Sequence, residues 1–299
     1  MPRILCIGDI MLDVTAILTR NIEIGVETRS KISTQGGGAA ANVASWLSAH
    51  GTSAYLIARV GEDAAGRVLL EELDRFGVEH GNRVIAGANT GVVMVLVDPL
   101  GERTMFPDSG ANAGLGPADL PELNSFDAIY LSGYPLLNPI SRPGVLEIIA
   151  LAKTANLPII FDPSTVGVLL EVGVAQVREW LQLMDAVILN EEEAQFLSGK
   201  ANPIEAAADL LTLTTTVVIK RGSNGALGQN RGGQLIQVPA FPATVVNTTG
   251  AGDAFAAGFI EFWANPAKSE NLIGALTRGA ELGAACVALI GARPLVAPQ

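Results

Sequence analysis

Short β-branched runs alternate with longer Ala- and Leu-rich amphipathic segments along this chain of 299 residues. This alternation limits the possible folds more than any other feature, because it is typical of βαβ units around a mostly parallel sheet. It predicts buried strands at 4–7, 54–58, 128–131, 158–161, 186–189 and 217–219. It predicts helices at 39–50, 64–76, 144–153, 174–182, 191–197, 204–211, 254–263 and 272–288. No internal repeat or long linker interrupts the pattern, so we expect one α/β domain over residues 1–299.

Three segments depart from this rhythm. Residues 91–107, GVVMVLVDPLGERTMFP, read as a hairpin around the turn Asp98-Pro99-Leu100-Gly101. Segments 14–19 and 27–34 are also extended and mixed in polarity. Together they predict a small sheet standing off the main one. The residues alone allow either an edge extension of the main sheet or a lid that closes over a site.

Net charge and cysteine usage exclude several classes of function. The net charge of −11 argues against a nucleic-acid surface, although backbone N–H groups can still bind an anionic ligand. Cys6 and Cys286 lie in apolar surroundings, which favours buried, reduced thiols. His50 and His80 are too few for a metal cluster or a His-based triad.

Apolar runs are too short for a membrane span or a signal-peptide core. The first run is interrupted at Gly8-Asp9, and no stretch reaches about 18 uninterrupted apolar residues. Composition is 49% hydrophobic and only 16% charged, which excludes a disordered chain. We therefore expect a soluble, cytoplasmic protein without a membrane partner.

Gly250-Ala251-Gly252-Asp253 places two glycines and a carboxylate directly before an apolar helical segment. Glycines there let successive N–H groups point at one spot, where the helix dipole adds positive charge and favours a phosphate. Asp253 is then either a helix N-cap beside a simple turn, or a base that takes a proton from an attacking hydroxyl. The chain lacks a G-x-x-x-x-G-K-[ST] motif, and G-x-G-x-x-G fails at this position.

A second glycine cluster precedes the segment 39–50, in QGGGAAANVASWLSAHG at 35–51. It is either a flexible turn or a place where the backbone approaches a polar ligand, with Asn42 offering a donor and an acceptor. Asp13 follows the first predicted strand at its carboxyl end, where open α/β sheets bind ligands. A carboxylate there suits a pair of sugar hydroxyls.

The two glycine clusters resemble the signatures of the ribokinase-like, or PfkB, carbohydrate kinases. The first is similar to the amino-terminal signature, and VVNTTGAGDAFAAGFI at 245–260 is similar to the carboxy-terminal one. Four intermediate stretches also fall in the family's order: ARVGEDAAGR (58–67), GERTMF (101–106), NEEEAQFLSG (190–199) and VVIKRGSNGAL (217–227). The resemblance runs the length of the chain. It implies a three-layer α/β/α sandwich with a small β-sheet lid, made here by segments 14–34 and 91–107.

The resemblance also implies roles for individual residues in an ATP- and Mg²⁺-dependent kinase. Asp253 would be the catalytic base, and the backbone of Gly250, Ala251, Gly252 and Asp253 the anion hole. Asp13, Gly37, Gly38 and Asn42 match positions that hold sugar hydroxyls. Asn190 and Glu193 match an element that positions Mg²⁺ and the phosphates largely through water, and Lys220, Gly222 and Gly225 match a loop lining the nucleotide.

Some residues depart from the family pattern. Asn247 stands where the carboxy-terminal signature usually has Asp, which in K⁺-activated relatives binds the ion beside the carbonyl at the Thr249 position. Further carbonyls would come from Cys286, Leu289 and Gly291, and Leu295 replaces an expected hydroxyl. These changes weaken a monovalent-cation site. The stretch FDPS at 161–164 lacks the Asn and Arg that several sugar kinases carry after Asp-Pro.

The expected substrate is the hydroxymethyl group of a sugar or sugar-like molecule, as in ribokinase or fructokinase. A nucleoside such as adenosine, pseudouridine, inosine or guanosine is the alternative, with Tyr134 and Phe106 available to stack on a base. Aromatic residues form only 5% of the chain, which mildly favours a sugar. A catalytically silent sugar-binding regulator would be expected to lose Asp253, Asn190 or Glu193. A homodimer through the lid would cover the apolar faces of 14–19 and 92–97.

Overall fold

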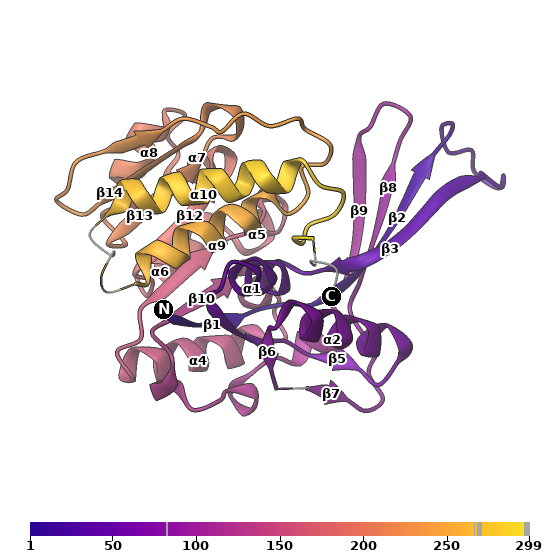
Figure 1. Cartoon of the computed structure of the whole chain (residues 1–299), viewed down its shortest axis with the longest axis horizontal. Coiled ribbons are helices and arrows are strands. Elements are labelled where there is room, and N and C mark those ends of the chain that lie inside the picture. The colour runs from indigo at the N-terminus through magenta and orange to yellow at the C-terminus, as the bar shows by residue number, and fades with distance from the viewer. Residues whose placement is uncertain (82, 266, 268–270, 296–299) are drawn as a thin grey trace.

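A nine-stranded sheet forms the centre of the computed structural model, which describes residues 1–81, 83–265, 267 and 271–295. Its order is β15-β14-β13-β12-β11-β10-β1-β4-β6, and the neighbours from β13 to β6 pair in parallel (Figure 1). The six strands predicted from the sequence are confirmed within one residue at each end. They are β1 (Arg3–Ile7), β4 (Ser53–Ile57), β10 (Ala128–Ser132), β11 (Ile159–Asp162), β12 (Ala186–Asn190) and β13 (Thr216–Lys220).

Several edge strands carry no clear sequence signal. β14 (Ala226–Asn230) and β15 (Ile236–Val238) add antiparallel to β13, β6 (Glu79–His80) closes the other edge, and β5 (Val60–Gly61) pairs with β7 (Val84–Ile85). In β14, a Cβ on Gly228 would lie 3.0 Å from the Leu276 side chain of α10 (Leu272–Val287). The glycine that obscures the strand pattern therefore lets this helix pack closely on the sheet.

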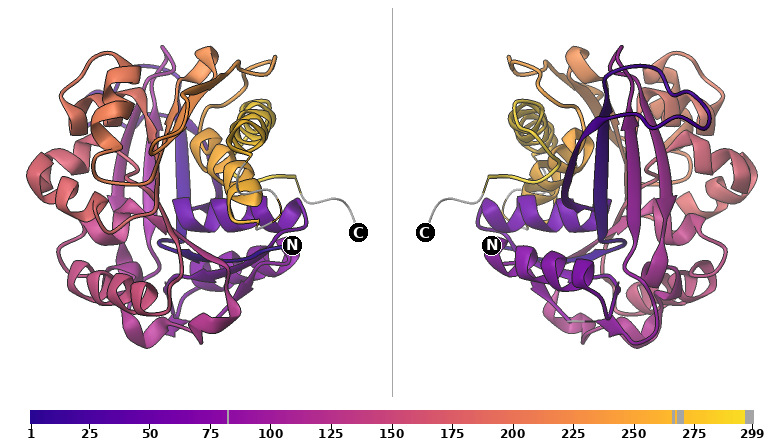
Figure 2. Two further views of the ribbon diagram at one scale, coloured as in Figure 1. Left: turned by 90° about the vertical axis from the view of Figure 1, so that its left-hand side faces the viewer. Right: turned by 90° about the vertical axis from the view of Figure 1, so that its right-hand side faces the viewer.

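Helices cover both faces of the sheet, so the main body has three layers (Figure 2). One layer holds α1, α9 and α10, and the other holds α4 and α6 to α8. All eight predicted helices are confirmed: α1 (Ala39–Ala49), α2 (Ala64–Phe76), α4 (Arg142–Thr154), α6 (Val174–Leu181), α7 (Glu191–Ser198), α8 (Pro203–Leu210), α9 (Ala251–Trp263) and α10. Shorter elements were not predicted: α3 (Gly133–Leu137), α5 (Val166–Val172) and 3₁₀ turns at Gly110–Gly114, Pro117–Asp119, Leu123–Ser125 and Gly222–Asn224.

Two apolar cores lie on opposite faces of the sheet. Along β1, Ile4 and Cys6 face the core under α1 and α9, while Leu5 and Ile7 face the core under α4. Strands buried on both faces read as continuous apolar runs, which is why they stand out in the sequence. Cys6 and Cys286 are both buried free thiols, as predicted.

The predicted small sheet is confirmed as a separate sheet of order β3-β2-β8-β9 that projects from the main body (Figure 1). Its strands are β2 (Met11–Leu18), β3 (Ser30–Gly37), β8 (Val92–Val97) and β9 (Arg103–Asp108). The hairpin turn between β8 and β9 closes as expected, with the Gly101 N–H donating to the Asp98 carbonyl at 3.0 Å. An edge extension of the main sheet is therefore excluded.

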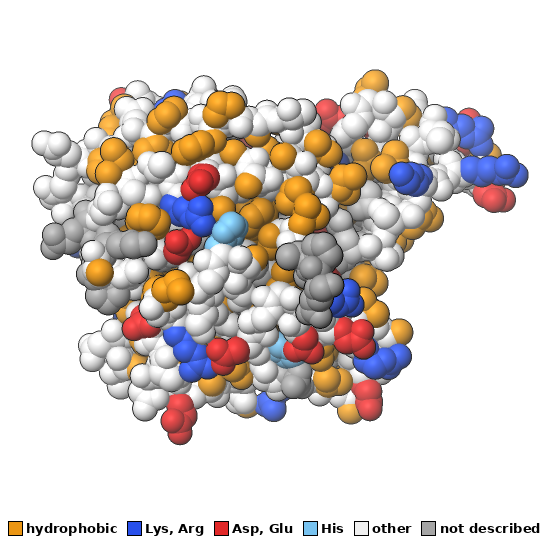
Figure 3. Space-filling model, in the orientation of Figure 1, with side chains coloured by type: hydrophobic (Ala, Val, Ile, Leu, Met, Phe, Trp, Pro, Cys, Tyr) orange, Lys and Arg blue, Asp and Glu red, His pale blue; other side chains and the backbone are white. Residues whose placement is uncertain are grey.

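Charged side chains of both signs are spread over the surface (Figure 3). On the face seen in Figure 3, Lys and Arg side chains are scattered among Asp and Glu and form no continuous basic patch. Among the residues that the model describes, no helix has the length and apolarity needed to cross a membrane.

Candidate active site

Polar residues gather where the parallel strands end. Asp9 follows β1, Ser132 ends β10, Asp162 ends β11, Asn190 ends β12 and Lys220 ends β13. Since these strands run in parallel, their carboxyl ends meet at one edge of the sheet, the usual ligand edge of open α/β folds. The two glycine clusters reach the same place through α1 and α9, because Asn42 contacts Asp253.

The start of α9 forms an anion cradle. Gly250 precedes the helix with φ 81°, and a Cβ on it would lie 2.5 Å from the Ala292 Cα, so only glycine fits. Among the described residues, neither the Gly252 nor the Asp253 backbone N–H has a hydrogen-bond acceptor. Two unpaired N–H groups at a helix N-terminus attract an anion. A Cβ on Gly252 would lie 3.3 Å from the Lys220 Nζ, which places an ammonium group beside this cradle.

Asp253 lies in the first turn of α9, three residues after its N-cap Gly250, and no side-chain cap bond forms there. The N-cap interpretation of Asp253 is therefore excluded. Its Oδ2 accepts a hydrogen bond from Asn42 Nδ2 at 2.8 Å. Burial raises the pKa of Asp253 to about 7, against the lowering effect of the Asn42 hydrogen bond. A carboxyl group with that pKa can accept a proton near neutral pH.

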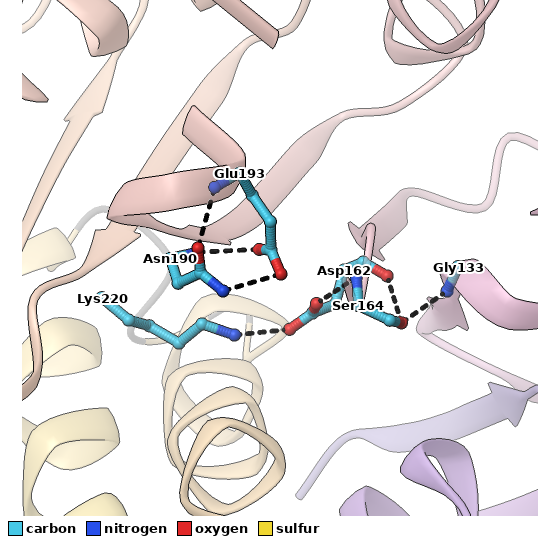
Figure 4. A network of polar contacts seen from close by, with 6 residues as sticks. All are labelled: Gly133, Asp162, Ser164, Asn190, Glu193 and Lys220. Carbon is cyan, nitrogen blue, oxygen red and sulfur yellow. Dashed lines mark hydrogen bonds and ion pairs between the residues drawn. The ribbon is translucent and has the colours of Figure 1, made fainter. Parts of the chain in front are cut away.

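Asp162 and Lys220 form an ion pair beside Asp253, with Nζ 2.7 Å from Oδ2 (Figure 4). Burial alone would lower the pKa of Lys220, but Asp162 and Glu193 outweigh it and hold that pKa above its ordinary value. The turn after Asp162 is strained, since Ser164 has φ 77°. Its N–H donates to Asp162 Oδ1 at 3.0 Å, and its hydroxyl accepts from the Gly133 N–H at 3.2 Å. This turn fixes the carboxylate that holds Lys220.

Asn190 and Glu193 form a capping box at the start of α7 (Figure 4). The Asn190 backbone N–H and Nδ2 each donate to a different Glu193 oxygen at 2.8 Å, and the Glu193 N–H donates to Asn190 Oδ1. Burial, with the Asp162 charge, raises the pKa of Glu193. Both of its oxygens are occupied, which suits an outer-sphere role toward a hydrated Mg²⁺. Within the described residues, no three His, Cys, Asp or Glu side chains converge to hold a metal directly.

Asp13, Gly37, Gly38 and Asn42 also lie together. Gly37 ends β3, where a Cβ would overlap the Asp13 carboxylate of β2, and Gly38 is the N-cap of α1 with φ 93°. Burial raises the pKa of Asp13 to about 6, while the Arg293 charge lowers it. A carboxylate and an amide directed at one place provide acceptors and a donor for hydroxyl groups.

The other predicted residues lie around this centre. Gly222 and Gly225 form the turn between β13 and β14, with φ values of 53° and 80°. Among the described residues they make no hydrogen bond to Asp253, and they follow Lys220 closely in the chain. Leu295 is 74% exposed.

A guanidinium group occupies the region where the resemblance implies a monovalent cation. Arg103 of β9 donates through Nη2 to Asn247 Oδ1 at 2.6 Å and through Nη1 to Thr249 Oγ1 at 2.7 Å. Asn247 Oδ1 also accepts from the Thr249 N–H at 2.9 Å, and the Thr249 carbonyl lies 3.5 Å from Cys286 Sγ. The small sheet thus contacts the loop that leads into the anion cradle.

Residues of this site to which the sequence assigned no role include Asp9, Arg103, Ser132, Asp162 and Arg293. Asp162 lies in the FDPS stretch and Arg103 in GERTMF. Both stretches stand out in the sequence, but neither indicates a role for these two residues. Arg293 lies in CVALIGARPL at 286–295, for which the resemblance implies backbone carbonyls and a hydroxyl as cation ligands but no role for the arginine. A charged residue in an otherwise apolar and glycine-rich tail was the available signal.

A model of the pfkB family of carbohydrate kinases matches residues 1–298. The chain belongs to this family. Its members are ATP-dependent kinases, and this chain is an enzyme of that class.

Individual relatives of this pfkB kinase differ in the molecule they phosphorylate. The ATP-dependent ribose-1-phosphate kinase of Halopiger xanaduensis is 32% identical over 295 residues, covering 94% of this chain and 93% of the relative. The structure of adenosine kinase from Sinorhizobium meliloti superposes with a TM-score of 0.88 at 22% identity, covering 99% of this chain and 96% of that one. Arabidopsis thaliana ribokinase, solved with ribose and ATP, gives 0.83 at 25% identity, with 97% and 94% covered.

Proposed function

We propose that this pfkB kinase transfers the γ-phosphate of ATP to a hydroxymethyl group of a sugar or sugar-like substrate, with Asp253 as the general base. One observation carries the proposal. Asp253, whose pKa is about 7, lies beside two unpaired backbone N–H groups and the Lys220 ammonium at the ligand edge of the sheet. A base beside an anion cradle is what phosphoryl transfer to a hydroxyl requires.

The remaining residues take roles that follow from their positions. The Gly250, Ala251, Gly252 and Asp253 backbone holds charge on the transferred group, and Lys220 adds a cation there. Asp13, Gly37, Gly38 and Asn42 orient the acceptor, with Asp13 accepting from hydroxyl groups. Gly222 and Gly225 line the nucleotide. Bound Mg²⁺ supplies charge neutralisation on the phosphates, and Asn190 and Glu193 hold its hydration shell.

We propose that residues 1–299 form a single kinase domain and that the small sheet acts as a lid over its active site. Arg103 supports this role, because it reaches from β9 to the loop before the anion cradle. The same guanidinium, facing the neutral Asn247, leads us to propose activity that does not require K⁺. The lid face opposite Arg103 carries Met94 and Phe106, 48% and 53% exposed, and we propose that a second copy covers it.

The choice between a sugar and a nucleoside is an outcome of the test. Phe106 lies on the face of the small sheet opposite Arg103, so the expectation that it could stack on a base is wrong. Tyr134, 38% exposed after β10, offers one aromatic face for a base, which is why nucleosides belong in the acceptor panel. The intact Asp253, Asn190 and Glu193 favour an active enzyme over a silent regulator.

The experiment is a coupled ADP-release assay with ATP and Mg²⁺ over a panel of pentoses, hexoses, phosphorylated pentoses and nucleosides. Each acceptor is tested with K⁺ and with tetramethylammonium as the monovalent cation. We expect one sugar to give the highest kcat/KM, at similar rates in both salts. If a nucleoside gives the highest kcat/KM, the proposed phosphoryl transfer stands and the proposed substrate class is wrong. No ADP release with any acceptor, despite ligand-induced rises in Tm, would overturn the kinase assignment for this chain.

A further inference from the structure

Arg293 is a buried arginine at the candidate site, and the mechanism above gives it no role. Its side chain is 4% exposed and contacts three elements. Nε donates to Asn42 Oδ1 at 3.2 Å, Nη2 donates to the Gly37 carbonyl at 2.9 Å, and Nη1 lies 3.0 Å from the Glu72 carboxylate of α2. A guanidinium taken out of water is costly unless such partners compensate it.

The backbone around Arg293 is shaped to receive it. A Cβ on Gly36 would overlap both the Arg293 guanidinium and the Glu72 carboxylate. The preceding residue, Ala292, lies against Gly250 and accepts a hydrogen bond from Trp46 Nε1 at 2.9 Å. The segment is therefore fixed between α1 and the start of α9, so Arg293 has one available position.

Asn42 connects Arg293 to Asp253. Its Oδ1 accepts from Arg293, and its Nδ2 donates to Asp253 Oδ2 at 2.8 Å. A side-chain amide has one acceptor end and one donor end. Turning it over would put its NH₂ group against the guanidinium and its oxygen against the carboxylate, and both contacts would be repulsive. Arg293 thus holds the amide in the single orientation that serves an ionised Asp253.

We propose that Arg293 is a positioning residue: through Asn42 it keeps a hydrogen bond directed at the general base, favouring its ionised, proton-accepting form. The inference rests on the proposed role of Asp253. Among the described residues, Arg293 makes no hydrogen bond to Asp253 or to the anion cradle. Its charge also attracts the Asp253 carboxylate directly, but its hydrogen-bonded route to that carboxylate runs through the amide of Asn42. The hydrogen bond from Asn42 is the largest lowering influence on the pKa of Asp253, consistent with this role.

Other charged groups also face this cluster and must be held constant in a test. Around Asp253 they are Asp162, Lys220 and Asp9, and around Arg293 they are Glu72 and Asp13. The Asp253 charge also acts on Tyr130, Tyr134 and Cys286. Burial, together with that charge, raises the pKa of each of these groups above its ordinary value. None of these groups is altered by the substitutions below.

The test measures the pKa of Asp253 directly, by carboxyl ¹³C NMR of aspartate-labelled protein with Asp253→Asn assigning the signal. Arg293→Met is compared with wild type and with Arg231→Met. Arg231 is the control for removing an arginine away from the site: it is exposed, and it donates to the backbone carbonyls of Leu211 and Thr214 at the other end of β13. We expect Arg293→Met to raise the pKa of Asp253 by about one unit and Arg231→Met to leave it unchanged.

A double-mutant cycle separates the route through Asn42 from the loss of a nearby charge. In an Asn42→Ala background, Arg293→Met should produce no further shift. An equal shift in both backgrounds, or the same pKa in Arg293→Met and Arg231→Met, would overturn the proposal. If Arg293→Met does not fold, Arg293→Lys serves instead. Lysine keeps the charge but cannot reach Asn42 and Gly37 together, so a smaller upward shift is expected and no shift contradicts the proposal.

Kinetics give a second readout. In Arg293→Met the acid limb of the kcat/KM profile should move to higher pH, with kcat reduced about tenfold and partly restored by added guanidinium ion. A reduced kcat with an unmoved acid limb would indicate only a structural role and overturn the proposal. The NMR measurement needs no substrate. If wild type phosphorylates no acceptor, the proposed function is wrong, but the NMR measurement still tests the inference about Arg293.

Discussion

Burial of Asp253, the proposed general base, costs the fold stability. The fold buries its carboxyl group next to Asp162 and provides one side-chain hydrogen bond, from Asn42. Its pKa rises from 3.8 to about 7, so the folded chain binds this proton more tightly than the unfolded chain does. The stabilising effect of the bound proton is complete below pH 3.8 and is lost as the pH rises through about 7.

Replacing Asp253 by Asn should therefore stabilise the protein in a pH-dependent way. At about pH 8.5 the variant avoids a buried charge, while at about pH 3.5 the carboxyl is protonated in most folded and unfolded chains, so Asp253 and Asn are nearly equivalent. We expect the Tm of Asp253→Asn to exceed that of wild type by a few degrees at the higher pH, since ~1 kcal/mol moves the Tm of a chain this size by roughly 2 °C. Thermal unfolding at both pH values checks this. A Tm difference that does not depend on pH would show that Asp253 is not buried as a charge.

At the scale of elements, the sequence predicted what depends on local pattern. Strands buried on both faces and helices with apolar faces were found within a few residues, because burial determines their composition. The helix α9 begins at Ala251, three residues before its predicted start, because Gly250 and Gly252 obscure the helical pattern there. The strand β14 was not predicted for a similar reason, because Gly228 weakens the strand pattern while it allows α10 to pack closely on the sheet.

The small sheet, our proposed lid, has an exposed apolar face that a second copy would cover. Register places Val14, Met94 and Phe106 across one face, and alternation places Asp13 and Arg103 on the opposite one. We expect wild type to sediment at twice the 31.0 kDa chain mass, and Met94→Glu with Phe106→Glu to sediment as a monomer. Ile273→Glu, which changes an equally exposed apolar residue on α10, should remain dimeric. A monomeric wild type, or dimeric lid variants, would contradict a lid interface.

At the scale of the whole molecule, the site is a meeting of distant segments. Asp13, Asn42, Asn190, Lys220 and Asp253 were indicated by motifs, and the fold brings Asn42 to Asp253 across 211 positions. Asp162 and Arg293 were not assigned, because an ion pair or a buried guanidinium depends on tertiary contacts that no local pattern records. Their partners, Lys220 and Asn42, lie 58 and 251 positions away.

The most direct measurement compares ATP binding with turnover in Asp253→Asn, using the acceptor that wild type prefers. If Asp253 is the base, the variant should bind ATP and the acceptor with Kd values within a few-fold of wild type. Its single-turnover rate of phosphoryl transfer should fall by about 10²–10⁴. A variant that retains wild-type transfer while binding both ligands would contradict the account, because the anion cradle would then act without a base at Asp253.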